Sequence, residues 1–238
     1  MVTSSTSTII RKELRALASP ETAVNLQRFF KTGPGQYGAG DVFLGIKVPP
    51  MRALARRHPD TDLETIATLL DSRYHEERFL ALLLLMQRYQ RGTQRDQIAV
   101  YDLYLGNTHR INNWDLVDIS APHIVGRHLQ DRSRKVLYTL ARSTSLWERR
   151  IAIISTLHFI RQEGFTDTLK IAKILLQDEH DLIHKAVGWM LREVGKRNLA
   201  NEKVFLLQHY RNMPRTMLRY AIEHFPESKR KRYLSGKV

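Results

Sequence analysis

The sequence predicts an all-α fold in which pairs of amphipathic helices stack into a right-handed solenoid. Signals for helix starts recur along the chain, whereas signals for strands are almost absent. Apolar residues follow each start at spacings of three and four, which is the period of a helix face. Similar helices also recur at intervals of about 35 residues.

Helix starts are marked by capping residues, because a side-chain oxygen satisfies backbone N–H groups that lack a partner in the first turn. Ser19-Pro20-Glu21 combines an N-cap with proline at the first helical position. Thr61 to Glu64 and Ser145 to Glu148 have the spacing of capping boxes. Only residues 41–48 have an extended pattern. The preceding loop, KTGPGQYGAG at residues 31–40, lacks the Gly-Lys-Ser/Thr ending of a phosphate-binding P-loop.

The period is read from basic residues near the start of four apolar helices. These are Arg78, Arg149, Lys185 and Arg219, separated by 71, 36 and 34 residues, and the missing member of the series falls at Trp114. Such a period in helix pairs is typical of HEAT or tetratricopeptide solenoids, and the tetratricopeptide consensus is not visible. We therefore expect about six HEAT-like helix pairs whose second helices line a concave, basic face.

Composition favours a polyanionic partner. The 238 residues include 38 Lys and Arg against 24 Asp and Glu, a formal net charge of +14. Nucleic acid is the leading partner, and ribosomes and anionic membranes are the alternatives. The absence of cysteine excludes disulfides, zinc ribbons and a thiol nucleophile. The longest apolar run, FLALLLLM at residues 79–86, is too short to span a membrane, and the N-terminus lacks the order of a secretion signal. We expect a soluble, cytoplasmic, nucleoid-associated protein.

Residues 181–196 form an amphipathic helix in projection. One side carries basic residues and a tryptophan, namely Lys185, Trp189, Arg192 and Lys196, and the opposite side is apolar. A tryptophan is usually part of a core, but this one falls within a basic stripe. Trp189 is therefore a candidate for contact with the partner.

A second helix that carries candidate site residues is predicted to begin after Asn112 or Asn113, one of which serves as its N-cap. Trp114 and Asp118 lie one turn apart on the same side of it, while Leu116 and Ile119 point away. Asp115, in the first turn, is interpreted as favouring the helix dipole. For Asp118 two interpretations remain: an ion pair between helices, or a carboxylate with a chemical role.

A carboxylate on a cationic surface is useful where positive charge develops during a reaction. Cleavage of an N-glycosidic bond passes through an oxocarbenium-like transition state, which carboxylates stabilise in related glycoside chemistry. Indole faces attract cations. Two tryptophans and an aspartate therefore suit removal of a cationic, alkylated purine.

Four segments resemble the conserved blocks of the AlkD-type alkylpurine DNA glycosylases, the DNA alkylation repair family with HEAT-like repeats. They are FLGIKVPPMR (43–52), NNWDLVD (112–118), WERRIAI (147–153) and HKAVGWMLRE (184–193), in the family's order. The resemblance implies that Asp118 is the catalytic aspartate and that Trp114 and Trp189 contact the lesion nucleotide. It also implies that Arg150 is the catalytic-site arginine near the DNA backbone. The family acts on duplex DNA containing alkylated purines without extruding the base into a pocket. Phe29 stands where the family can carry a tyrosine.

The predicted activity is hydrolysis of the N-glycosidic bond of N3- or N7-alkylated purines. Because such a base already carries positive charge, no metal or cofactor is expected. The expected DNA-binding residues are Lys47, Arg149, Lys185, Arg192 and Arg219. We expect the protein to act on DNA as a monomer, without an obligate protein partner.

The predicted organisation is a disordered segment at residues 1–7, a repeat domain at 8–228 and a basic tail at 229–238, either solvated or in weak contact with phosphates. His180 and His184 are interpreted as solvated or capping residues, because a third metal ligand is missing. Two other functions stay open: a non-catalytic binder of DNA structures on the same fold, and a HEAT-type scaffold for a protein partner.

Overall fold

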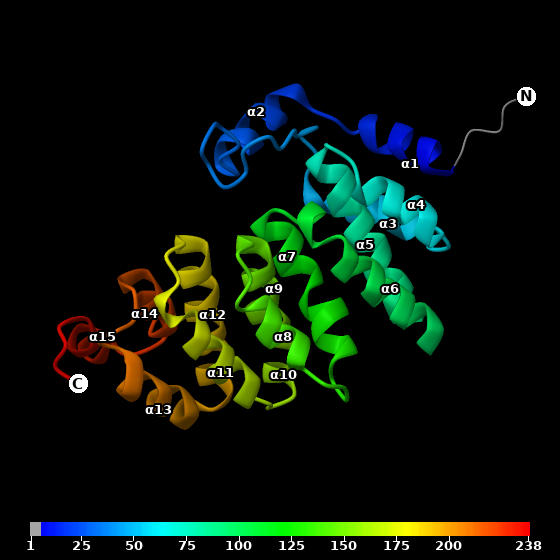
Figure 1. Ribbon diagram of the computed structural model, residues 1–238. Coiled ribbons are helices and arrows are strands. Elements are labelled where there is room, and N and C mark those ends of the chain that lie inside the picture. Colours follow the sequence, from blue (N-terminus) through cyan, green and yellow to red (C-terminus); the bar gives the residue numbers. More distant parts are fainter. Residues whose placement is uncertain (1–5) are drawn as a thin grey trace, which may run out of the picture. The chain divides into compact units, whose positions relative to one another are not determined.

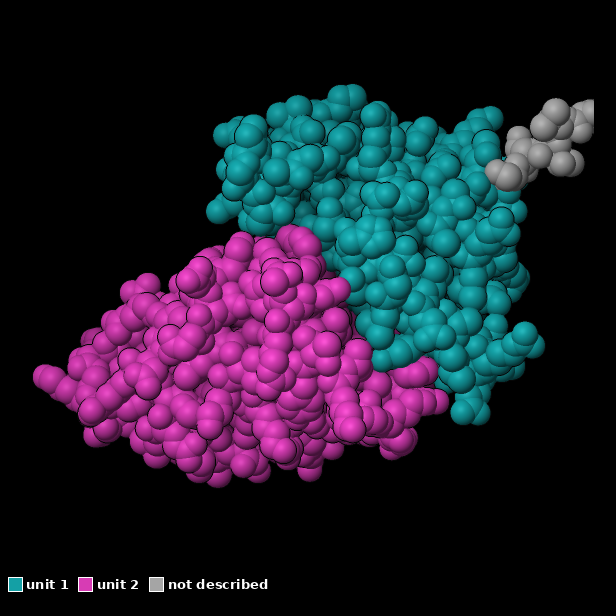
Figure 2. Space-filling view, in the orientation of Figure 1, with its two compact units in different colours: residues 1–116 teal, residues 117–238 magenta. Residues whose placement is uncertain are grey.

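The computed structural model describes residues 6–238, and this part of the chain is helical (Figure 1). One isolated bridge, between Val42 and Tyr74, is the β-type pairing found in it. The chain divides into two compact units, residues 1–116 and 117–238 (Figure 2). The prediction of an all-α fold is confirmed.

The first unit is built around α5, a helix that is buried on most of its circumference along its first three turns. This burial explains the uninterrupted apolar run after Arg78, because a helix that is apolar all round must be covered on all sides. Helices α3, α4 and α6 pack against α5, and α1 packs on α3 and α4. The elements are α1 (Thr6–Arg15), α2 (Pro20–Phe29), α3 (Val48–Arg57), α4 (Leu63–Leu70), α5 (His75–Arg91), α6 (Gln94–Gly106) and η1 (Thr108–Arg110).

Helix α7 (Trp114–Ser120) runs across the boundary between the units, so Trp114 belongs to the first and Asp118 to the second. The second unit is built around α12 (Asp181–Arg197), which packs against α9, α13 and α14. The remaining elements are η2 (Pro122–Gly126), α8 (Lys135–Leu140), α9 (Leu146–Ser155), α10 (Leu157–Arg161), α11 (Thr166–Ile174), η3 (Leu175–Gln177), α13 (Leu199–His209), α14 (Arg215–Ala221) and α15 (Glu227–Leu234).

The capping signals locate most helix starts that were predicted from them. The Ser19 hydroxyl accepts from the Thr22 N–H at 3.3 Å before α2. The Ser145 hydroxyl accepts from the Glu148 N–H at 3.4 Å before α9. Residues 31–40 form turns, as predicted.

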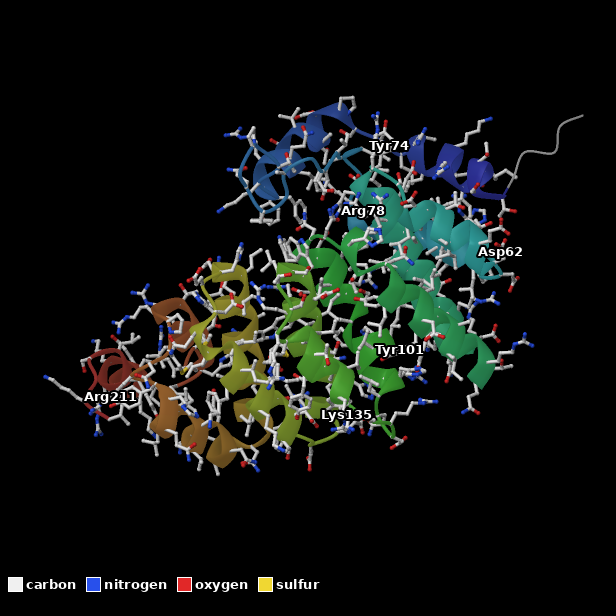
Figure 3. The ribbon with its side chains drawn as sticks, viewed as in Figure 1. Asp62, Tyr74, Arg78, Tyr101, Lys135 and Arg211 are labelled. Carbon is white, nitrogen blue, oxygen red and sulfur yellow. The ribbon has the colours of Figure 1, made fainter. Side chains whose placement is uncertain are left out.

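The start assigned to Thr61 is one residue too early. Asp62 caps α4 by accepting from the Thr65 N–H at 2.7 Å, whereas the Thr61 hydroxyl donates to the His58 carbonyl at 2.8 Å. Figure 3 labels Asp62 at this end of α4. Either residue type can cap a helix, so the sequence alone did not decide between two neighbours.

The crossing of α12 and α14 depends on a glycine. A Cβ at Gly188 would lie 2.5 Å from the Met217 carbonyl oxygen, closer than packed atoms allow. The absence of a side chain lets the two backbones approach, and this contact helps to fix α12 in the second unit.

The predicted disordered segment lies outside the described residues except for Thr6 and Ser7, which begin α1. At the other end, α15 includes residues 229–234 of the predicted basic tail, and Tyr233 on this helix is buried. No described helix is both long and apolar enough to cross a membrane.

Candidate functional site

Helix α7 carries two of the predicted site residues one turn apart. Its first N–H, that of Trp114, donates to the Asn113 side-chain oxygen at 2.8 Å. Leu116 is fully buried, whereas Trp114 and Asp118 are both half-buried. The predicted burial of Leu116 is confirmed, but Ile119, which was also expected to point away, is half-buried like Trp114 and Asp118.

In the first unit, Trp114 belongs to an aromatic cluster. Its ring stacks on Phe30 with centroids 5.2 Å apart, and Phe30 stacks on Phe43 at 5.0 Å. Phe29 meets the Trp114 ring edge-on at 5.9 Å and is 63% exposed. The cluster fixes the plane of the indole while leaving Phe29 open to solvent.

A buried histidine beneath this cluster joins two carboxylates. His75 Nδ1 lies 3.1 Å from Asp41 Oδ2, and its Nε2 lies 2.8 Å from Asp115 Oδ2. A neutral imidazole donates from one nitrogen only, so both contacts are favourable only for the imidazolium. Burial lowers the pKa of His75, but the charges and hydrogen bonds of Asp115 and Asp41 outweigh it and raise the pKa to about 9.

Asp41 also receives a hydrogen bond and ion pair from Arg78 and a hydrogen bond from the Asn113 amide at 3.3 Å. Although burial raises the pKa of Asp41, its hydrogen bond to His75 and the Arg78 charge produce a net lowering. Arg78, labelled in Figure 3, is buried and also donates to the Ser72 carbonyl at 3.0 Å. Arg78, one of the basic residues that mark the repeat period, is thus buried inside the first unit and is not part of an exposed basic face.

The segment that carries Phe43 is held by Glu76 of α5. The buried Glu76 carboxylate accepts from the N–H groups of Leu44, Gly45 and Ile46 at 2.8, 2.8 and 3.1 Å. Gly45 has a φ of 82°, and a Cβ there would meet the Ser19 carbonyl oxygen at 2.0 Å, so this position requires glycine. Glu76 and His75 together fix the Phe43 segment and the start of α7.

In the second unit, Asp118 and Arg150 form a bidentate ion pair. Arg150 Nε and Nη2 donate to the two carboxylate oxygens at 2.9 and 2.8 Å, and Nη1 donates to the Leu182 carbonyl at 2.5 Å. The Arg150 side chain is 6% exposed and that of Asp118 is 18% exposed. This is the ion pair between helices that sequence reasoning left open for Asp118. It also directs the three guanidinium nitrogens of Arg150 to protein acceptors, so in this structure Arg150 orients Asp118.

Trp189 lies on the side of α12 that was predicted to be polar. Its Nε1 donates to Glu193 at 3.3 Å, and Lys196 Nζ lies 2.7 Å from the same carboxylate. Burial raises the pKa of Glu193, but the hydrogen bond from Lys196 leads to a net lowering. The apolar side, Ile183, Val187, Met190, Leu191 and Val194, is completely buried, as predicted.

The predicted DNA-binding residues fall into two groups. Three of them are ion-paired in the second unit: Arg149 with Asp178 at 2.6 Å, Lys185 with Asp181 at 2.7 Å, and Arg192 with Glu223. Lys47 and Arg219 are exposed. Lys47 precedes α3 in the first unit, and Arg219 lies on α14 in the second.

Sequence reasoning missed the network of His75, Asp41 and Glu76, and it gave Asp115 a role in the helix dipole alone. Three charged residues follow His75 directly, in the sequence HEER. Such a run of charges is typical of a helix start that is exposed to solvent. Most of the groups that these charged residues bind lie 30 or more residues away in the sequence. Of the two roles expected for His180, solvated or capping, the structure shows capping, because its Nδ1 accepts from the Leu182 N–H at 3.1 Å before α12.

The described residues hold no group of three His, Cys, Asp or Glu side chains placed to bind a metal ion. The chemistry available in the second unit is that of an oriented, partly exposed carboxylate, and in the first that of an aromatic face.

Comparison with known proteins gives a matching family and similar solved structures. The family model of the DNA alkylation repair enzymes matches residues 10–225. A solved structure, a predicted DNA alkylation repair enzyme from Enterococcus faecalis, has a TM-score of 0.67 at 20% identity and covers 88% of this chain and 97% of its own. At that identity the likeness shows a shared fold. A search among curated proteins gives no match.

Proposed function

We propose a reaction for this chain on the premise that it belongs to the DNA alkylation repair enzyme family. As a member, it acts in the repair of alkylation damage, and DNA is its substrate. The reaction is hydrolysis of the N-glycosidic bond of N3- or N7-alkylated purines in duplex DNA, without extrusion of the base into a pocket. The enzyme is a monofunctional DNA glycosylase of base excision repair.

The observation that carries this proposal is the bidentate pair of Asp118 and Arg150. A guanidinium that binds both carboxylate oxygens fixes the plane of the carboxylate, and 18% of the Asp118 side chain remains exposed. Positive charge develops on the sugar as the glycosidic bond breaks, and a preoriented anion stabilises it without reorganising. Asp118 would also position the attacking water.

Trp114 and Trp189 hold the lesion nucleotide in this proposal, since each indole is half-buried and so presents part of its surface. An indole face attracts a cationic base by about 0.5 to 2 kcal/mol. The alkylated base already carries positive charge and leaves readily, so the reaction needs no metal, cofactor or strong general acid.

The DNA-binding face in this proposal contains Lys47, Arg149, Lys185, Arg192 and Arg219, arranged on the concave side of a right-handed solenoid of about six HEAT-like pairs. The net charge of +14 supports phosphate binding. The ion pairs of Arg149, Lys185 and Arg192 would open or shift as phosphates replace carboxylates. We further propose that the enzyme works as a cytoplasmic, nucleoid-associated monomer, with its repeat domain at 8–228.

The test is base release from duplex DNA containing a single 7-methylguanine, compared between the wild type and Asp118→Asn at equal DNA occupancy. We expect a rate at least about tenfold lower in the variant, roughly 1.4 kcal/mol of transition-state stabilisation. Asp167→Asn is the matched control, because Asp167 forms a comparable ion pair with Arg134 at 2.6 Å in the same unit. Equal losses in both variants would assign Asp118 a structural role.

The second candidate function is a non-catalytic binder of DNA structures, and the same ion pair favours it, because a salt bridge between α7 and α9 stabilises either protein. It predicts that the wild type binds DNA and releases no alkylated base. A scaffold for a protein partner predicts no steep linear fall of log affinity for DNA with log salt concentration.

A further inference from the structure

A cavity of about 210 Å³ lies in the second unit, apart from Asp118 and Arg150. It is bounded by the C-terminal half of α12, the start of α13 and the chain from the end of α14 into α15. Its walls are largely apolar, from Leu199, Ala221, Phe225 and Pro226. At about 30 Å³ per water molecule, the space equals that of roughly seven waters, which suits one planar heterocycle.

Glu202 of α13 lines this cavity and is 2% exposed. Its Oε1 has no hydrogen-bond partner in the described structure. The other oxygen, Oε2, lies directly over Gly195 of α12, where a Cβ would come within 1.8 Å of it. A buried acid in this position is costly as an anion, and burial raises the pKa of Glu202 to about 8, against a lowering by Lys203.

Cations surround the same cavity. Arg192 and Lys196 come from α12, Lys203 from α13 and Lys229 from α15, and all four line it. The Lys229 ammonium lies 5.9 Å from the centroid of the Phe225 ring. Arg192 pairs with Glu223, and its buried Nε has no hydrogen-bond partner. The cavity thus combines an apolar interior, one inner carboxyl group and several positive charges.

We propose that this cavity binds an adenine nucleotide, with the base against Glu202 and the phosphate on the surrounding lysines. A neutral carboxyl group presents one O–H donor beside one carbonyl acceptor. Adenine presents the complementary pair, N1 as acceptor and the 6-amino group as donor. Guanine also presents such a pair, O6 as acceptor and N1–H as donor, but its 2-amino group would then lie against the apolar walls without an acceptor, which weakens its binding.

The nucleotide has two sources with the same chemistry: a free adenine nucleotide, or an unpaired adenine within a DNA strand. The cavity shares Arg192 with the proposed DNA-binding face, but its lining does not include Asp118, Trp114 or Trp189, and Glu202 has no role in the proposed glycosylase. Base release from 7-methylguanine DNA by Glu202→Met should therefore equal that of the wild type.

Isothermal titration with AMP and GMP at pH 7 tests the free nucleotide, using wild type, Glu202→Met and Glu202→Gln. Methionine keeps the length of the side chain without hydrogen bonding, and we expect it to weaken AMP binding about tenfold or more. Glutamine keeps a donor beside an acceptor and should retain AMP. Lys170→Ala on α11, outside the cavity, is the control for general loss of charge, and circular dichroism verifies that each variant folds.

Titration of AMP between pH 6.5 and 9.5 tests the protonation state. Wild-type affinity should be constant below pH 8 and fall about tenfold per pH unit above it, because the ionised carboxylate opposes adenine N1. Glutamine does not ionise, so Glu202→Gln should bind AMP equally at both ends of the range. The charged or titratable groups that face Glu202 from the packed elements are Arg192, Lys196, Lys203, Glu223, His224, Lys229 and Tyr233.

A second experiment tests the nucleotide within a strand. Fluorescence anisotropy measures the binding of duplexes that contain one unpaired adenine or one unpaired guanine. AMP binding that depends on Glu202 supports a free nucleotide. A preference for unpaired adenine that Glu202→Met removes, without AMP binding, supports a nucleotide within a strand. The proposal is overturned if neither AMP nor the unpaired adenine is affected by Glu202→Met, or if GMP binds as tightly as AMP.

Discussion

The stability of the first unit should depend on the charge of His75. Both ring nitrogens of this buried side chain face carboxylates, so deprotonation leaves one nitrogen lone pair directed at a carboxylate oxygen. The pKa of His75 in the folded protein is about 9, against 6.5 for an unperturbed histidine. Raising the pH from 6 to 10 therefore removes an interaction that ties α5 to the start of α7.

The sign and size follow from linkage. A group whose pKa is raised by folding stabilises the folded state fully below its unfolded pKa, and that contribution is lost as the pH rises through the folded pKa. For His75 the window is pH 6.5 to about 9. The full contribution is on the order of 3 kcal/mol, falling by about 1.4 kcal/mol per pH unit within the window.

Urea denaturation at pH 6 to 10 measures this contribution through Trp114 fluorescence. The chain has three tryptophans, so a background of Trp147→Phe and Trp189→Phe leaves Trp114 as the reporter of the first unit. His75→Gln in that background should be less stable than its parent at pH 6.5, and the two should converge near pH 9. His109→Gln, at an exposed position in the same unit, is the matched control.

Parallel curves for His75→Gln and its parent between pH 6.5 and 9 would refute the reasoning. They would mean that His75 is neutral in the folded protein and that one of the two carboxylates binds a proton instead.

Three further predictions concern single substitutions. Arg150→Lys keeps the charge but not the bidentate geometry, so 7-methylguanine release should fall roughly tenfold or more at unchanged DNA occupancy; full activity would show that the orientation of Asp118 is unimportant. Gly188→Ala places a Cβ 2.5 Å from a backbone oxygen of α14, so urea denaturation of the second unit should show a loss of about 1–3 kcal/mol, and an unchanged midpoint would contradict the close crossing. Arg219→Ala should lower the slope of log DNA affinity against log salt by about one. Arg149→Ala should lower it less, because it removes a cation that is already paired with a carboxylate. A larger decrease for Arg149→Ala than for Arg219→Ala would place Arg219 away from DNA.

The helices could be predicted because their signals are local. Ser19 and Ser145 cap helices by bonding to N–H groups three residues away, and the apolar side of α12 follows from periodicity alone. The error at Thr61 has the same local origin, since Thr61 and Asp62 are both good caps and only the fold around His58 selects one.

The partners of charged residues could not be predicted, because they come from distant segments. Arg78 is one of the basic residues that mark the repeat period, and nothing near it in the sequence indicates its partner, Asp41, 37 residues earlier. Arg150 was expected near phosphates, and in the structure it binds Asp118, 32 residues earlier. Formal charge is visible in a sequence, but which charges cancel depends on the fold.

In the proposed function, the pairing of Asp118 with Arg150 explains how a carboxylate can lie on a DNA-binding surface. An unpaired Asp118 would repel phosphates, but the guanidinium of Arg150 compensates its charge at contact distance. In the proposed reaction, the pair as a whole is neutral towards DNA, while the carboxylate would still stabilise a cation that forms beside it. Removing the carboxylate should therefore weaken catalysis and strengthen binding.

Asp118→Asn separates these two effects. The variant leaves the Arg150 charge uncompensated, so DNA affinity at low salt should rise, and the slope of log affinity against log salt should steepen by up to about one if Arg150 then binds a phosphate. Fluorescence anisotropy with an undamaged duplex measures the affinity and its salt slope. The salt concentration is varied from about 50 to 200 mM, because affinities that depend on phosphate contacts fall steeply over that range. Asp167→Asn also frees an arginine, Arg134, and is the control for net charge alone. Equal gains in the two variants would mean that DNA responds only to the overall charge of the protein, and the neutral pair would then have no special place on its binding surface.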